Sequence, residues 1–105
     1  MGTIDVNPVR KEARSPAERH ITSRELRQFL TVVRRKSFTN ETFRQWRGVA
    51  KVTSRGLYTG FERDRLALVA LYMLEGKSRR DMGLKVRIKL LLNKEKGFSE
   101  STASN

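Results

Sequence analysis

A short segment after residue 38 carries side chains that can hydrogen-bond to nucleic-acid bases and phosphates. The amides of Asn40 and Gln45 can pair bidentately with adenine, and the carboxylate of Glu41 can accept hydrogen bonds from cytosine. Arg44 and Arg47 can bind phosphate oxygens. The same residue types also occupy ordinary exposed helix positions, so the segment favours recognition of nucleic acid without excluding a plain solvated surface.

The chain offers little for catalysis or metal binding. His20 is the one histidine, and the nearby carboxylates of Glu18 and Glu25 form no recognisable catalytic arrangement. The sequence contains no Gly-rich phosphate loop and no Ser-His-Asp set. Because there is no cysteine, disulfides and thiolate metal sites are excluded. We therefore expect no enzymatic activity, no cofactor and no bound metal.

The charge of the chain is strongly positive. Its 105 residues include 23 Lys and Arg against 11 Asp and Glu, which gives a formal net charge of +12. Residues 21–96 hold 19 of the basic and seven of the acidic residues, so this segment carries the whole excess. Such a charge opposes folding by self-repulsion, and binding to a polyanion offsets it through phosphate neutralisation and counterion release. Nucleic acid is the favoured partner; an acidic protein, a membrane surface, or simply high solubility are the alternatives.

Nothing in the sequence predicts a membrane protein. No apolar run approaches the length of about 20 residues that a membrane-spanning helix needs. Residues 1–7 also lack the charged-then-apolar order of a secretory signal. The expected location is cytoplasmic, in association with the nucleoid.

Two helices are predicted in the first half of the chain. The first begins at Thr22, with Glu25 completing a capping box. Its apolar face consists of Leu26, Phe29, Leu30 and Val33. The second is shorter and ends near Gly48: Thr39 is its N-cap, and Phe38 can pack on Phe43 as a hydrophobic staple. Spacing from Phe43 places Trp46 in the core rather than in a base-stacking position.

The second half is predicted to hold a wing and two further helices. Residues 49–61 combine β-compatible residues with turn formers, which indicates a two-stranded ribbon with Ser54, Arg55 and Gly56 at its tip. A buried helix is expected over residues 62–75, with Gly76 just past its end. Ser78 and Asp81 then cap a segment over residues 79–92. Residues 84–92 alternate as a strand would, but they also show helical rows, and good helix formers favour the helix.

These elements describe a mainly α fold: a winged helix-turn-helix of about four helices with a short two-stranded wing. Residues 1–20 are expected to be a flexible arm, residues 21–96 the folded domain, and residues 97–105 a disordered tail. In this architecture the second helix lies in the major groove and the wing meets the adjacent backbone.

The segment from Thr39 through Thr42, Phe43 and Arg44 to Trp46 resembles the recognition-helix signature of MerR-type regulators and the related excisionases. That signature reads Ser or Thr, two variable residues, Thr, an aliphatic residue, Arg, a variable residue, then Tyr or Trp. The similarity extends over residues 21–92, with the wing, the aromatic-to-leucine spacing into the third helix and the turn at residues 76–82 in the family's order.

Departures from the family pattern restrict what the resemblance implies. The first turn is longer and contains Arg34, Arg35 and Lys36, Ala50 stands at a common glycine, and Glu62 replaces the usual serine cap. The long dimerisation helix, the effector domain and the metal-binding cysteines of the family have no counterpart. The resemblance therefore implies a DNA-binding module with no small-molecule effector.

The sequence thus predicts a sequence-specific regulator of double-stranded DNA, most simply a repressor. An excisionase-like factor that bends DNA in recombination, an RNA- or ribosome-binding protein and a basic adaptor for an acidic protein stay open as alternatives. Ile88, Leu91 and Leu92 of the C-terminal segment can form a homodimer contact or, alternatively, simply close the core. The predicted DNA-binding residues are Thr39, Asn40, Glu41, Thr42, Arg44, Gln45, Arg47, Lys51, Arg55 and Tyr58.

Overall fold

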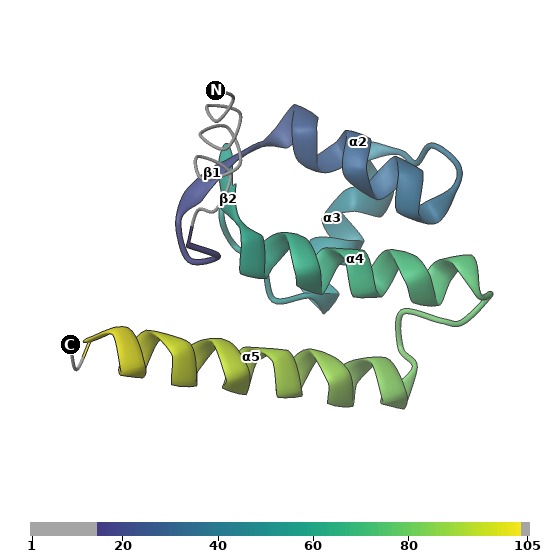
Figure 1. The fold of residues 1–105 in the computed structure, drawn as a ribbon. Helices are drawn as coiled ribbons and strands as arrows, with labels where there is room; N and C mark the ends of the chain where they lie inside the picture. Colours follow the sequence, from purple (N-terminus) through teal and green to yellow (C-terminus); the bar gives the residue numbers. More distant parts are fainter. Residues whose placement is uncertain (1–14, 104–105) are drawn as a thin grey trace, which may run out of the picture.

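The computed structural model describes residues 15–103 of the chain. In order, its elements are β1 (Arg19–Thr22), α2 (Ser23–Arg34), α3 (Asn40–Val49), β2 (Leu57–Thr59), α4 (Gly60–Leu74) and α5 (Met82–Ala103). The described part is therefore mainly helical with one two-stranded antiparallel sheet, as the sequence predicted. Helix α4 lies between α2 and α5, and α3 packs behind it (Figure 1).

The predicted helix starts of α2 and α3 are confirmed. In α2, Glu25 N donates to Thr22 Oγ1 at 3.1 Å and Thr22 N donates to Glu25 Oε1 at 3.0 Å, which completes the capping box. In α3, Thr39 Oγ1 accepts from Thr42 N at 3.1 Å. These local interactions fix where the two helices of the helix-turn-helix begin.

An aromatic cluster closes the turn between α2 and α3. The ring centroid of Phe38 lies 6.1 Å from that of Phe43 and 4.8 Å from that of Trp46, which confirms the predicted staple. The guanidinium of Arg27, from α2, lies 5.0 Å from the Phe38 ring centroid. Arg35 ends α2 in the left-handed conformation, with φ of 66°, so the turn reverses there. The longer turn is thus a well-packed one.

The predicted ribbon within residues 49–61 is wrong in its pairing. Strand β2 pairs not with a preceding strand of that segment but with β1, in a register that places Ile21 opposite Tyr58. Both side chains are buried, at 7% and 2% exposure, because this pairing closes the core beside α4. Residues 52–55 form an irregular loop instead of a strand.

The folded unit also begins before residue 21, where the flexible arm was predicted to end. Strand β1 starts at Arg19. Upstream of it, the main-chain oxygen of Pro16 accepts a hydrogen bond from Phe61 N at 3.1 Å. A Cβ at Gly60 would lie 3.3 Å from Pro16 Cα, so this contact is tight on both sides. Residues 16–20 therefore belong to the domain, whereas residues 1–14 of the predicted arm lie outside the described part.

Helix α4 contributes most to the core, as predicted, but its cap differs from the expected one. Thr59 is the N-cap: its Oγ1 accepts from Glu62 N at 3.0 Å while Glu62 Oε1 accepts from Thr59 N at 2.9 Å. Glu62 is thus the capping-box partner, not a substitute for a serine cap. The fully buried residues of α4 are Leu66, Val69 and Ala70.

The ambiguous C-terminal segment is a helix, as favoured. Its core residues Leu84 and Ile88 lie four residues apart on one face, while Val86 and Leu90 are exposed on the opposite face. The alternation that mimicked a strand came from these two helical rows read together. The helix starts three residues later than predicted, at Met82 instead of residue 79. Its N-cap is Asp81 and not Ser78, since Asp81 Oδ1 accepts a hydrogen bond from Leu84 N at 3.1 Å. It runs to Ala103, past residue 97, where a disordered tail was expected.

Candidate nucleic-acid interface

The outward face of α3 presents the polar side chains that the sequence singled out. Asn40, Glu41, Arg44 and Gln45 are all exposed, while Phe43 and Trp46 on the opposite face are buried. The hydroxyls of Thr39 and Thr42, which were also predicted to contact DNA, lie 3.1 Å apart, and Thr39 Oγ1 caps the start of the helix. The candidate base-reading groups are the amides and the carboxylate.

On this face of α3, Arg44 and Glu41 form an ion pair. Arg44 Nη2 donates to Glu41 Oε1, and Gln45 Nε2 lies 3.5 Å from Glu41 Oε2. The Arg44 hydrogen bond and charge lower the pKa of Glu41 below its ordinary value. Because the two side chains are 74% and 60% exposed, solvent screens the ion pair and it contributes little to stability. Arg44 can therefore leave Glu41 for a phosphate at small cost.

Arg47, which was predicted to contact DNA, also binds the backbone of the loop that follows α3. It is half-buried, and its Nη2 donates to the main-chain oxygen of Ser54 at 2.8 Å. Its guanidinium lies 5.9 Å from the Phe43 ring centroid. Arg47 Nε is buried and has no hydrogen-bond partner among the described residues. Arg47 thus holds the loop of residues 52–56 against α3.

Glu62 anchors the same loop from its other side. Ser54 Oγ donates to Glu62 Oε2 at 2.6 Å, and Arg19 Nη1 donates to Glu62 Oε1 at 3.1 Å. Since Glu62 is 7% exposed, this buried carboxylate joins β1, the loop and the start of α4. Gly56 follows with φ of 91°, a conformation that favours glycine. The backbone of Arg55 therefore lies between the anchored Ser54 and the turn at Gly56.

Arg55 and the first half of α3 share a shallow cleft of about 480 Å³. Its lining residues are Asn40, Glu41, Phe43, Arg44, Arg47 and Arg55. The structure thus brings the loop arginine next to the candidate base readers, as a wing would.

Tyr58 is a wrong prediction as a DNA-binding residue. Its side chain is 2% exposed and belongs to the core, because the β1–β2 register turns it inward against Ile21. It cannot reach a phosphate or a sugar without unfolding the sheet.

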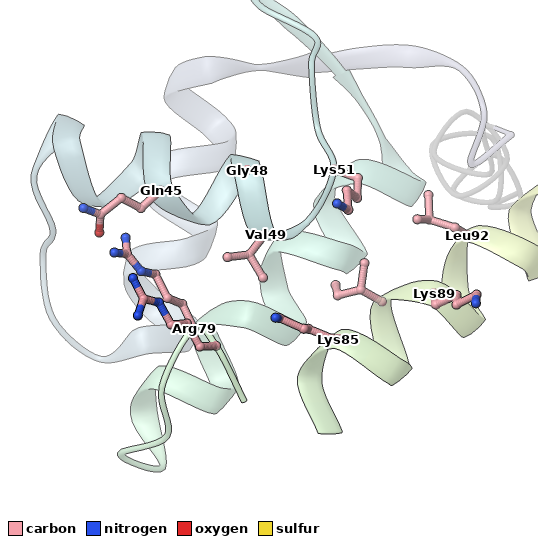
Figure 2. Close-up of a pocket in the computed structure, with 10 residues that line it drawn as sticks. Gln45, Gly48, Val49, Lys51, Arg79, Lys85, Lys89 and Leu92 are labelled. Atoms are coloured by element: carbon pink, nitrogen blue, oxygen red, sulfur yellow. The ribbon is translucent and has the colours of Figure 1, made fainter. Parts of the chain in front are cut away.

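A basic groove, which the sequence did not predict as a unit, lies on the other side of α3 (Figure 2). Its volume is about 680 Å³. In Figure 2, Gln45 of α3 and Arg79 of the α4–α5 turn lie toward one end, and Lys89 and Leu92 of α5 toward the other. Its lining residues are Gln45, Gly48, Val49, Lys51, Arg79, Arg80, Lys85, Ile88, Lys89 and Leu92.

The groove brings five cations together, and none of its lining residues is acidic. Of these cations only Lys51 was among the predicted site residues. Lys85 and Lys89 are four residues apart and therefore share a face of α5, which helical spacing alone would have shown. Their approach to α3, by contrast, depends on the packing of α5 against α4.

The predicted dimer contact is wrong for Ile88, which is 2% exposed and packs in the core. Leu92 packs partly against that core, and Leu91 is half-buried. Among residues 82–97 of α5, the exposed large apolar side chains are instead Met82, Val86 and Leu90.

No family model, no curated protein and no solved structure matches the chain. Within residues 15–103, no helix is long and apolar enough to cross a membrane. The same residues hold no group of three or more His, Cys, Asp or Glu side chains placed to bind a metal ion.

Proposed function

We propose that this protein binds double-stranded DNA sequence-specifically and acts as a transcriptional regulator. Helix α3 enters the major groove, and the two basic surfaces beside it contact the phosphates on either side. The domain is, in this proposal, a MerR-like winged helix-turn-helix module.

One observation carries the proposal: the exposed polar residues of α3 lie between two groups of cations. Arg44, Arg47 and Arg55 line the cleft on one side. On the other side, five Lys and Arg side chains line the groove shared with α5. A helix in the major groove, which is about 12 Å wide, meets base edges at its centre and a phosphate strand on each side. The arrangement of charges matches that geometry.

The small size of the domain favours recognition of paired sites on DNA. A single module of this size buries on the order of 600–1,000 Å² of protein surface on DNA. Useful specificity then needs a second copy on a neighbouring half-site. We propose cooperative binding of two copies, with spacing set by the helical repeat of the duplex.

A selection from random-sequence duplex DNA with the purified protein, at about 150 mM salt, tests the proposal. We expect enrichment of a motif with two spaced half-sites. An inverted repeat favours a regulator, whereas direct repeats with cooperative bending favour the architectural alternative. The absence of an enriched motif, with RNA or an acidic protein competing better than duplex DNA, would overturn it.

A further inference from the structure

Helix α5 carries an apolar stripe on the side that faces away from the core. Met82, Val86 and Leu90 are 70%, 54% and 60% exposed, and they follow one another at intervals of four residues. The core residues Leu84 and Ile88 lie on the opposite face. Isolated exposed apolar residues are ordinary, but three in one row form a surface that favours a partner.

Cations border this stripe on both sides. At about 100° per residue, Lys85 and Lys89 lie along one edge and Arg87 and Lys94 along the other. Within Met82–Gly97 the one acidic residue is Glu95, and it pairs with Arg65 of α4. The carboxylate is 17% exposed in its side chain, so it offers little charge to a partner. The surface is therefore apolar along its centre and positive along both edges.

A small pocket adjoins the stripe where α5 meets α4. Its volume is about 290 Å³, and its lining residues are Leu68, Arg87, Leu90, Leu91 and Lys94. Three leucines form an apolar lining, and two cations stand beside it. Such a pocket fits an aliphatic side chain whose neighbours are carboxylates.

We propose that this face of α5 binds an acidic amphipathic helix of another protein. The partner helix places aliphatic residues at intervals of three to four on the stripe and in the pocket, with Asp and Glu facing the flanking cations. A second copy of this chain is a poor occupant, because two such faces would bring Lys and Arg edges together. The apolar stripe itself lies outside the α3–α5 groove, because neither Val86 nor Leu90 lines that groove. The two surfaces share one edge, formed by Lys85 and Lys89.

The test measures fluorescence polarisation of a labelled helical peptide of about 18 residues, long enough for five turns, added to the full chain. The peptide carries leucines along one face and glutamates elsewhere. We expect saturable binding that weakens about tenfold or more when Val86→Ser and Leu90→Ser are combined, since each removes buried apolar contact. Val32→Ser is the matched control: Val32 is 75% exposed on α2 and lies beside Arg24 and Arg27, so its loss should leave binding unchanged.

A charge-reversal variant gives an independent readout. Arg87→Glu combined with Lys94→Glu should abolish binding of the acidic peptide and confer binding of a peptide in which lysines replace the glutamates. Circular dichroism verifies that both double variants are folded. Binding that survives both, or that is unchanged when the peptide's leucines become alanines, would show non-specific charge attraction and overturn the proposal.

Two further measurements separate the other occupants. Sedimentation equilibrium that shows a dimer lost in the Val86→Ser, Leu90→Ser variant would assign the face to a second copy. Binding to vesicles of equal parts phosphatidylcholine and phosphatidylglycerol that is tighter than peptide binding and lost in the same variant would assign it to an anionic membrane. Either result overturns the proposal. DNA selection is independent of all of them, so a failure here leaves the DNA-binding proposal intact.

Discussion

Arg65 Nε donates a hydrogen bond to the main-chain oxygen of Ala50 at 2.7 Å, which ties α4 to the end of α3. The same guanidinium pairs through Nη1 with Glu95 of α5 and through Nη2 with the oxygen of Lys51, at 3.4 Å. Arg65 is 5% exposed. One buried side chain therefore holds together the two helices that form the walls of the basic groove.

Replacing Arg65 with methionine should reduce the free energy of unfolding by about 3–5 kcal/mol, because Glu95 then loses its buried partner and Ala50 O its donor. Urea denaturation measures the change. Arg63→Ala, on the same helix but half-buried, should cost only about 1 kcal/mol or less, because it loses an exposed ion pair and a contact at 5.6 Å with the Phe29 ring. Equal effects of the two substitutions would contradict the structural role of Arg65.

Substitutions of two lysines on α5 distinguish phosphate binding in the basic groove from a general effect of net charge on DNA binding. Lys89→Ala should weaken DNA binding and reduce the slope of log affinity against log salt by about 1, because Lys89 lines the groove beside α3. Lys94→Ala changes the net charge equally but lies on the other side of α5, at the leucine pocket. It should leave the salt slope unchanged in filter-binding titrations. If both variants lose the same affinity, the groove is not a phosphate-binding surface.

The outward residues of α3 and the loop should divide into phosphate contacts and base readers. Arg44→Ala and Arg55→Ala should weaken binding to specific and random duplex alike, each reducing the salt slope by about 1. Gln45→Ala should cost about 1–3 kcal/mol on the preferred sequence and little on random DNA, because an amide pairs with particular base edges. Competition titrations with both duplexes measure this. Equal losses on both duplexes for Gln45→Ala would remove α3 from the role of recognition helix.

The starts of α2 and α3 were predictable because an N-terminal cap is a contact over three residues. Thr22 with Glu25 and the Thr39 cap needed no knowledge of the rest of the chain. The sheet was not predictable in the same way. Tyr58 pairs with Ile21, which is distant in sequence, so nothing in residues 49–61 reveals that the partner strand lies before α2. The same long-range register turns Tyr58 inward and removes it from the interface.

The residues of the candidate site on α3 could be predicted from the sequence, whereas most of the cations that α5 and the α4–α5 turn contribute could not. Local spacing was enough to place Asn40, Arg44 and Gln45 on one exposed face. Arg79 and Lys85 reach the neighbourhood of Gln45 only through the packing of α5 on α4, which depends on buried contacts between separate elements. The spacing of apolar residues over 84–92 fits both a strand and a helix. Which face Lys85 and Lys89 share depends on which of the two forms.

The stability of the domain should depend on pH through the α2 capping box. Hydrogen bonds from the backbone and hydroxyl of Thr22 lower the pKa of Glu25 below its ordinary value. Because the folded-state pKa is the lower one, the contribution to stability is present above the unfolded-state pKa and is lost as pH falls through the folded-state pKa.

Glu25→Gln should therefore lower the midpoint of thermal unfolding at neutral pH and change it less in acid, below the ordinary glutamate range. Thermal unfolding followed by circular dichroism at the two pH values measures this difference. Gln28→Ala, an exposed and uncharged position on the same helix, should shift the midpoint equally at both pH values. A Glu25→Gln effect that is the same at both pH values, or larger in acid, would show that the ionised carboxylate does not stabilise the start of α2.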